Sequence, residues 1–311
     1  MFITLGIVLV SFIGLYVYNQ YQYKMAEVTY PPKGEFIEVD GIKLHYLSKG
    51  SGKPIVFLHG GVLSSEDFSE VINLAATNGY RAIAFDRPGY GYSERPLNEE
   101  VTPVTQAWLI HQALKEMQIT EPIILVGHSW SGTMTMSYAL QFPEDVSGLV
   151  TLGGAMYKEG YPAENGDSLS KLVTTPVVGD FIMNTLLATP IGKNMGRITT
   201  KQTFAPEEPP VGYEEKLLAL WGRPGQFKAN REDTLAFPKT SKEISPHYPK
   251  IKQPTVIVVG DKDPFSTIQM ADRLHRDLPN SVMVKLSNVG HMIPENHPEK
   301  VLEAIERLKS M

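Results

Sequence analysis

The stretch from Pro122 to Thr133 contains the residues best suited to chemistry. Its sequence is P-I-I-L-V-G-H-S-W-S-G-T, in which an apolar run is followed by Ser129 among small residues. The apolar run predicts a strand buried on both faces, and the residues from Ser131 onward predict a helix. A serine on a tight turn between such a strand and helix exposes its hydroxyl beside the helix N-terminus. Ser129 is therefore the candidate nucleophile.

A serine hydroxyl needs a base, and the base needs an acid, before it attacks a carbonyl at neutral pH. His291 is the favoured base because it lies in a loop directly after the apolar run 282–286. Asp261 and Asp263 both follow the apolar run 254–260. Asp263 is favoured as the acid because it lies deeper in the loop, with Asp261 as the alternative.

Acyl transfer also requires N–H donors for the oxyanion that forms during attack. The backbone N–H of Trp130 is the predicted first donor because it lies at the start of the helix. The second is expected in the loop after His59, where Gly61 presents its amide without a side chain and Val62 is the less favoured choice. His59 and His128 are predicted to organise loops through hydrogen bonds.

Large apolar side chains near these positions are candidates for the substrate pocket and indicate an apolar substrate. The same side chains, at helical spacing, are also typical of an ordinary core. The candidates are Trp130, Met134, Met156, Trp221 and Phe227.

The N-terminal stretch Phe2–Tyr18 is uncharged and almost wholly apolar, and its length reaches the lower end of a membrane-spanning helix. Tyrosines cluster at its end, as in the aromatic belt of a membrane interface. An uncleaved anchor is favoured over a cleaved signal peptide, because no basic residue precedes the apolar run and no A-x-A-like site follows it. The third interpretation is a buried helix. The clustered tyrosines are Tyr16, Tyr18, Tyr21 and Tyr23.

The expected location is therefore the membrane, with secretion after signal cleavage as the alternative. The lysines that follow the span favour a cytoplasmic body, although folded domains are also exported against that bias. These lysines are Lys24, Lys33, Lys43 and Lys49.

Composition narrows the possible partners. The 311 residues are 42% hydrophobic and 20% charged, with a net charge of −5 and no basic run, so nucleic acid is not an expected partner. The absence of cysteine excludes disulfides, thiol nucleophiles and cysteine metal sites. The sequence predicts no metal and no cofactor, and a small-molecule ester or acyl compound as substrate.

Apolar runs alternate with helical patterns along most of the chain, which predicts an α/β fold with a mostly parallel, doubly wound sheet. Alternation stops near Ala155 and resumes near residue 251, so the intervening residues are predicted to form a helical lid insertion over the sheet edge. The expected divisions are an N-terminal transmembrane anchor or signal segment, two parts of the core, and the lid. Their ranges are 1–24 for the anchor, 25–154 and 251–311 for the core, and 155–250 for the lid.

The ordered motifs resemble those of the α/β-hydrolase fold superfamily over about residues 35–308. They are His59-Gly60-Gly61, Asp86-x-x-Gly89-x-Gly91-x-Ser93, Gly127-His128-Ser129-Trp130-Ser131-Gly132, Gly260-Asp261-Lys262-Asp263 and Gly290-His291. The resemblance implies a Ser129–Asp263–His291 triad with Gly61 and Trp130 as oxyanion donors. The chain departs from the family pattern at Ser131, where the fifth position of the nucleophile turn is usually glycine.

The expected function is hydrolysis of a carboxylic ester or similar acyl bond through an acyl-enzyme. A serine at position 129 argues against the epoxide hydrolases and haloalkane dehalogenases of this fold, which the resemblance associates with an aspartate there. Alternatives with the same triad are a carbon–carbon bond hydrolase, a perhydrolase and an acyltransferase. A ligand-sensing protein with slow turnover and a degenerate binding module are the alternatives from other classes.

Overall fold

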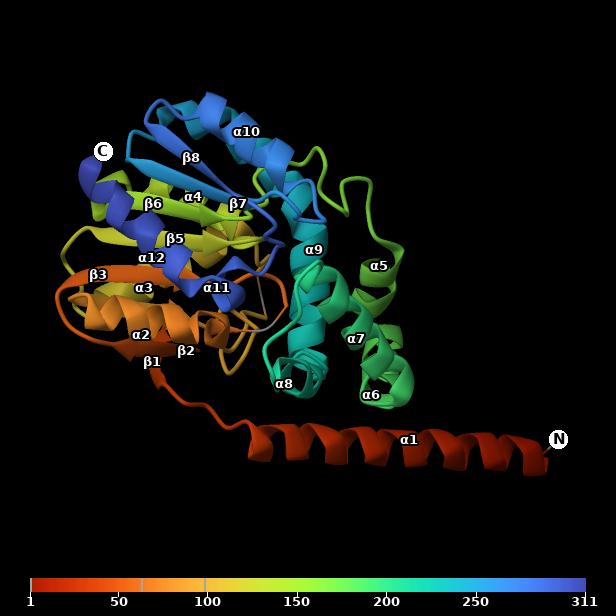
Figure 1. Cartoon of the computed structure of the whole chain (residues 1–311). Coiled ribbons are helices and arrows are strands. Elements are labelled where there is room, and N and C mark those ends of the chain that lie inside the picture. The colour runs from red at the N-terminus through yellow and green to blue at the C-terminus, as the bar shows by residue number, and fades with distance from the viewer. Residues whose placement is uncertain (1, 63, 98) are drawn as a thin grey trace.

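The computed structural model describes residues 2–62, 64–97 and 99–311, and an eight-stranded sheet lies at its centre (Figure 1). The strand order is β1-β2-β4-β3-β5-β6-β7-β8. The pairs β1–β2 and β2–β4 are antiparallel, and the other neighbours are parallel. The strands are β1 (Glu35–Val39), β2 (Ile42–Lys49), β3 (Lys53–Leu58), β4 (Tyr80–Phe85), β5 (Ile123–His128), β6 (Val146–Leu152), β7 (Thr255–Gly260) and β8 (Ser281–Leu286).

Both faces of the central strands are covered, which explains why their sequences are continuously apolar. In β3, Ile55 and Phe57 pack in one hydrophobic cluster, whereas Val56 and Leu58 pack in the other. Helices α2 and α12 cover the first face, and α3 and α4 the second (Figure 1). The helices of the core are α2 (Ser69–Thr77), α3 (Pro103–Glu116), α4 (Ser131–Gln141), α10 (Thr267–Asp277), α11 (Ile293–Asn296) and α12 (Pro298–Arg307), and short 3₁₀ helices lie at Ser65–Phe68, Pro143–Asp145, Ser245–Lys250 and Leu308–Ser310.

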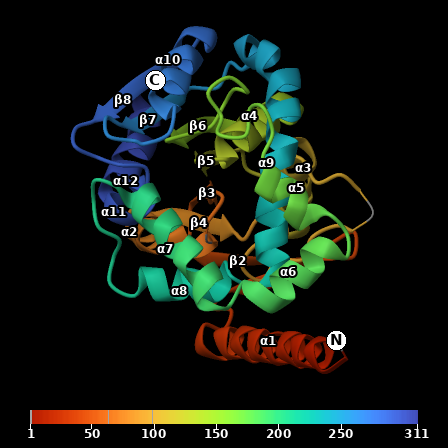
Figure 2. The same ribbon diagram turned by 90° about the vertical axis from the view of Figure 1, so that its right-hand side faces the viewer.

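A group of helices, called the lid below, lies between β6 and β7 in sequence. Figures 1 and 2 show these helices beyond the C-terminal ends of the parallel strands, the edge where such sheets bind ligands. The lid has a small core of its own, which includes Phe204, Leu217 and Trp221. The predicted fold class is confirmed. The lid helices are α5 (Ser168–Thr174), α6 (Val178–Leu186), α7 (Pro190–Phe204), α8 (Tyr213–Leu220) and α9 (Pro224–Ile244).

Helix α1 (Phe2–Thr29) continues well past Tyr18, where the apolar stretch ends. Its second half lies along the lid, beside α6 and α8 (Figure 1). Within the described residues it is the one helix long and apolar enough to cross a membrane, and a signal sequence has the same properties. Only 6% of its most apolar window is buried, which argues against the interpretation as a buried core helix.

Candidate active site

The turn between β5 and α4 holds Ser129 in an uncommon backbone conformation. Its φ of 54° lies in the left-handed region, which costs a non-glycine residue on the order of 1 kcal/mol or more. Two hydrogen bonds secure the turn: the Ser129 amide donates to the carbonyl of Leu152, and its carbonyl accepts from the amide of Gly132, both at 2.9 Å. A Cβ atom at Gly127 would lie 2.0 Å from the hydroxyl of Thr135, so only glycine lets α4 approach β5 this closely.

The structure brings together the three side chains predicted from separate loops. His291 Nε2 lies 2.8 Å from Ser129 Oγ, and His291 Nδ1 lies 2.6 Å from Asp263 Oδ2. Asp261 points elsewhere: its carboxylate accepts the Asn288 amide at 2.7 Å in an exposed loop. Of the two carboxylates that follow β7, Asp263 is therefore the one that contacts the histidine.

Asp263 is nearly fully buried, and its surroundings favour the carboxylate form. Burial alone would raise its pKa, but the charge of His291, the hydrogen bond from the same ring and the amide of Phe265 at 2.9 Å together hold the pKa of Asp263 below its ordinary value. An ionised Asp263 accepts a hydrogen bond from Nδ1–H of His291. That hydrogen bond leaves the Nε2 lone pair directed at the Ser129 hydroxyl.

The neighbouring histidines have structural contacts, and burial favours the neutral form of His59 and His128. Burial, followed by the charge of Arg87, lowers the pKa of His59 to about 3, and burial with the nearby His291 lowers the pKa of His128 to about 3. His59 accepts the Arg87 amide, and His128 Nε2 donates to the carbonyl of His291 at 3.0 Å. His297 is the N-cap residue of α12 and pairs with Glu207 at 2.7 Å. The structure brings His291 alone among these four to Ser129.

A cavity of about 160 Å³ lies beside the Ser129 hydroxyl, between the sheet edge and the lid. Gly61 and Trp130, the predicted oxyanion donors, both line it, as does Val62. Its other walls come mainly from the lid and from the loop after β7. The principal wall residues are Tyr161, Pro162, Thr199, Thr203, Trp221, Phe265 and Met270.

Of the remaining predicted pocket residues, only Trp221 lines this cavity. Met134 and Met156 are buried in the hydrophobic cluster under α3 and α4. Phe227 is buried in the core of the lid, where its ring packs edge-on against Trp221 at 4.9 Å. Sequence alone does not reveal which side of a buried helix faces a cavity. Apolar character therefore did not predict which of these side chains line the cavity.

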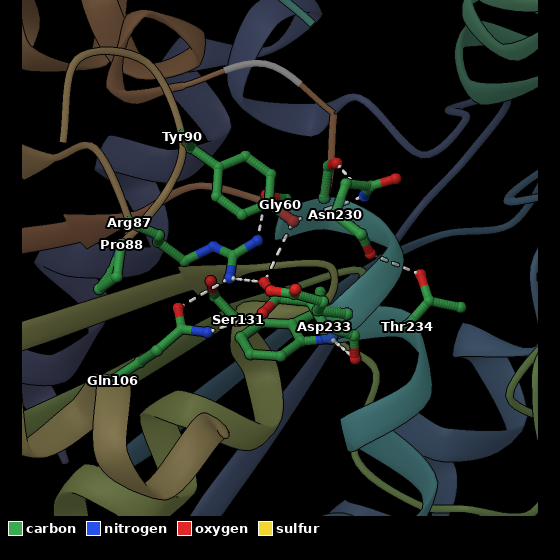
Figure 3. A network of polar contacts seen from close by, with 12 residues as sticks. Gly60, Arg87, Pro88, Tyr90, Gln106, Ser131, Asn230, Asp233 and Thr234 are labelled. Carbon is green, nitrogen blue, oxygen red and sulfur yellow. Dashed lines mark hydrogen bonds and ion pairs between the residues drawn. The ribbon is translucent and has the colours of Figure 1, made fainter. Parts of the chain in front are cut away.

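A buried polar network that sequence analysis did not predict lies behind the loop of Gly60 (Figure 3). The guanidinium of Arg87 donates to the Gly60 carbonyl at 3.0 Å and to the carboxylate of Asp233 at 2.6 Å. Arg87 also lies between the rings of Tyr90 and Trp130, with its guanidinium carbon 4.2 Å from each ring centre. Because Asp233 belongs to α9, this ion pair joins the lid to the core.

The same loop has further hydrogen bonds on its carbonyl side. Ser131 Oγ donates to the His59 carbonyl at 2.5 Å, so the departure from glycine at position 131 supplies a contact at the nucleophile turn. Asn230, one turn before Asp233 on α9, donates to the Gly61 carbonyl at 2.5 Å. Thus the carbonyls of three consecutive residues are bonded to side chains, of which Asn230 also lines the cavity.

A cluster of carboxylic acids lies next to the cavity under α8. Burial raises the pKa of Glu295 to about 7 and raises that of Asp67, which lines the cavity, well above its usual range. Asp67 accepts a hydrogen bond from Tyr213 at 3.0 Å, and Lys216 pairs with Glu66 at 3.2 Å. Burial here therefore favours the protonated form of both acids, which the unfolded chain would ionise near neutral pH.

These raised pKa values predict that stability falls as the pH rises. Because the folded state binds more protons than the unfolded state between the ordinary carboxyl pKa and about 7, the free energy of unfolding decreases through that window. Glu295→Gln should therefore stabilise the chain at pH 8 by on the order of 2 kcal/mol and far less at pH 5. Urea unfolding at both pH values measures the difference, with the exposed Glu299→Gln as control. An equal effect at both pH values would contradict the assignment.

Comparison with known proteins identifies the family of the chain. The family model described as alpha/beta hydrolase fold matches residues 53–298. The chain belongs to this family. The uncharacterized hydrolase YugF of Bacillus subtilis is 30% identical over 86% of this chain and 94% of its own length.

Solved structures of the family superpose well. An esterase from Exiguobacterium antarcticum has a TM-score of 0.71 at 25% identity, covering 89% of this chain and 99% of its own. A structure described as a membrane phospholipase A has a TM-score of 0.69 at 18% identity and covers 99% of this chain and 96% of its own, which shows a shared fold. The chain is thus a hydrolase of the α/β-hydrolase fold, and its relatives include esterases, dehalogenases and carbon–carbon bond hydrolases.

Proposed function

We propose that this hydrolase cleaves a carboxylic ester or similar acyl bond through a covalent acyl-enzyme, with Ser129 as nucleophile. The observation that carries the proposal is the chain of two short contacts, 2.8 Å and 2.6 Å, that joins Ser129 through His291 to Asp263 beside a cavity. The esterase among the structural relatives also supports it.

In the proposed reaction, His291 Nε2 accepts the Ser129 proton while Oγ attacks the carbonyl carbon. The tetrahedral intermediate collapses as His291 gives that proton to the leaving oxygen, and the bond between carbon and the leaving group breaks. Water then attacks the acyl-enzyme with His291 as base, the acid leaves and Ser129 regains its proton. Asp263 stays ionised and stabilises the imidazolium in both steps.

The oxyanion would bind the backbone amides of Gly61 and Trp130. The buried network around Arg87 would fix the orientation of the Gly61 amide. In a trans peptide the carbonyl of one residue and the N–H of the next point in opposite directions. Arg87 and the ring of His59 both bond the Gly60 carbonyl, so the Gly61 N–H lies on the opposite side of that peptide from these two side chains. Arg87 is therefore a positioning residue, and Asp233 fixes its guanidinium.

This role predicts different outcomes for two arginines that share the same partner. Arg87→Lys removes the forked contacts to the loop and should lower kcat by about 10²-fold with little change in KM, as loss of an oxyanion donor does. Arg95→Lys is the matched control, because Arg95 also pairs with Asp233, at 2.9 Å, but its backbone contact is to the Pro88 carbonyl and not to the loop of Gly60. Inhibition by a trifluoromethyl ketone should weaken in parallel with kcat for Arg87→Lys only. Equal kinetics for the two variants would contradict the positioning role.

The size of the cavity suggests which acyl groups enter it. At about 160 Å³ it is close to cavities that hold one benzene molecule, so it accommodates an acyl group of roughly six carbons. The direct test is hydrolysis of p-nitrophenyl esters from C2 to C12 by the full chain in detergent. Steady turnover with an optimum at short chains supports the proposal. A burst of one equivalent followed by no further release would instead favour the ligand-sensing alternative.

We also propose that α1 remains attached as a membrane anchor. Asn19 is fully buried against the lid, where it donates to the Thr185 carbonyl at 2.9 Å and accepts the Ala188 amide at 2.7 Å. Tyr23 donates to the Met183 carbonyl at 2.7 Å. Cleavage after these residues would leave buried polar groups of the lid without partners, which is costly. Mass spectrometry of the protein from membranes should therefore find α1 intact.

A further inference from the structure

We infer that the outer side of the lid lies on the lipid bilayer and that the enzyme takes its ester from that bilayer. The inference rests on the proposed hydrolase function and on the proposed anchor. It concerns one surface, called the apolar lid face, formed by exposed apolar side chains of α5, α6 and α7 and of Val177, the residue before α6. These side chains are Leu169, Leu172, Val177, Val178, Phe181, Ile191 and Ile198.

The exposure of this face is unusual for a soluble domain. Val177 is 78% exposed and Ile191 is 73% exposed, and the neighbouring members of the face are at least 40% exposed. Most of the other large apolar side chains that are exposed among the described residues belong to α1 itself. Clusters of this kind mark contact surfaces for membranes or partners.

The direction of α1 identifies the bilayer as the occupant. Figure 1 shows the N-terminal end of α1 extending past α6, and Figure 2 shows α5, α6 and α7 on the side towards which that end projects. The two surfaces are continuous, because the rings of Phe12 on α1 and Phe181 on α6 meet at 5.1 Å. A bilayer entered by the first half of α1 would therefore also meet the apolar lid face.

Charge on the same helices agrees with a lipid headgroup layer. Within the described residues 168–204, the only acidic residue is Asp180, although the whole chain has a net charge of −5. Basic side chains beside exposed apolar ones are typical of surfaces that bind anionic membranes. The basic residues of these helices are Lys171, Lys193, Arg197 and Lys201, of which Arg197 pairs with Glu214 and Lys193 donates to Gln22 of α1.

One helix separates this face from the catalytic cavity. Thr199 and Thr203 of α7 line the cavity, whereas Ile191 and Ile198 of the same helix are exposed. An amphiphilic ester in the bilayer would thus have to pass only the edge of α7 to bring its carbonyl to Ser129. The geometry points to a substrate that partitions into membranes and whose short acyl end fits the cavity.

A fluorescence experiment tests the location of the lid. Because the chain has no cysteine, a dye reacts only with the cysteine that the variant introduces. The full chain is incorporated in phosphatidylcholine–phosphatidylglycerol vesicles with an environment-sensitive dye on a single cysteine, Val177→Cys. The matched control is Lys252→Cys, an exposed site before β7, at the opposite end of the parallel strands. We expect quenching by nitroxide-labelled lipids at Val177→Cys and by aqueous iodide at Lys252→Cys.

Two results would overturn the inference. A Val177→Cys dye quenched by iodide and not by nitroxide lipid would place the face in water. A dye shielded from both quenchers would show that a second copy or another protein covers it. Neither result depends on turnover, so both are distinct from a failure of the proposed hydrolase function.

A comparison of hydrolysis rates gives a second, independent test of the inference. We expect the double variant Leu172→Glu/Val177→Glu to lower the ratio of bilayer-ester to p-nitrophenyl acetate hydrolysis about tenfold, because carboxylates on the face oppose contact with lipid. An unchanged ratio in vesicles would contradict delivery from the bilayer. Absence of p-nitrophenyl acetate hydrolysis by the parent chain would contradict the hydrolase proposal instead.

Discussion

Ser129→Ala is expected to abolish steady-state ester hydrolysis, with kcat falling by on the order of 10⁴- to 10⁶-fold. The reason is that Ser129 Oγ is the atom 2.8 Å from His291 Nε2, and no acyl-enzyme forms without it. Release of p-nitrophenol measures the loss. Labelling by a fluorophosphonate probe should disappear as well, because the probe requires an activated serine.

A matched variant separates this effect from general damage to the sheet. Ser147→Ala removes a partly buried hydroxyl that donates to the Ile123 carbonyl at 3.0 Å, at the far end of the neighbouring strand. It should retain turnover and labelling. Residual labelling of Ser129→Ala, with the protein folded, would show that another nucleophile reacts and that the turn after β5 has a different role.

The residues of the proposed triad were predictable because each follows a short apolar run. Such runs are strands buried on both faces, and parallel strands end at the same edge of the sheet. Ser129, His291 and the pair Asp261 and Asp263 were therefore expected at one edge before any distance was known. The choice between the two aspartates needed the loop geometry, since both follow β7 within a few residues.

The contacts across the lid were not predictable to the same degree. Arg87 and Asp233 are 146 residues apart, and a single sequence holds no signal that pairs them. The lid cavity is lined in part by polar positions such as Thr199 and Thr203, whereas the apolar candidates Met134 and Met156 pack in the core. Apolar character predicts burial, but whether a buried side chain faces a cavity or a neighbouring helix depends on how the helices are rotated.

Asp263→Asn provides the sharpest test of whether the Asp263 carboxylate sets the tautomer and stabilises the charge of His291. An asparagine of the same shape can donate to His291 Nδ1, which favours the tautomer whose Nε2 carries the proton and cannot accept one from Ser129. Loss of the negative charge also removes the stabilisation of the imidazolium. We expect kcat to fall by about 10⁴-fold, with KM little changed, because the cavity wall is intact.

Asp261→Asn is the matched control, since it makes the same chemical change two residues away. Its carboxylate accepts a loop amide, that of Asn288 at 2.7 Å, so activity should stay within about twofold of the parent. If the two variants exchanged these outcomes, Asp261 would be the acid, and the loop after β7 would have to rearrange in the working enzyme. If neither lowered kcat, His291 would act without a carboxylate partner. The 2.6 Å contact between His291 and Asp263 would then have only a structural role.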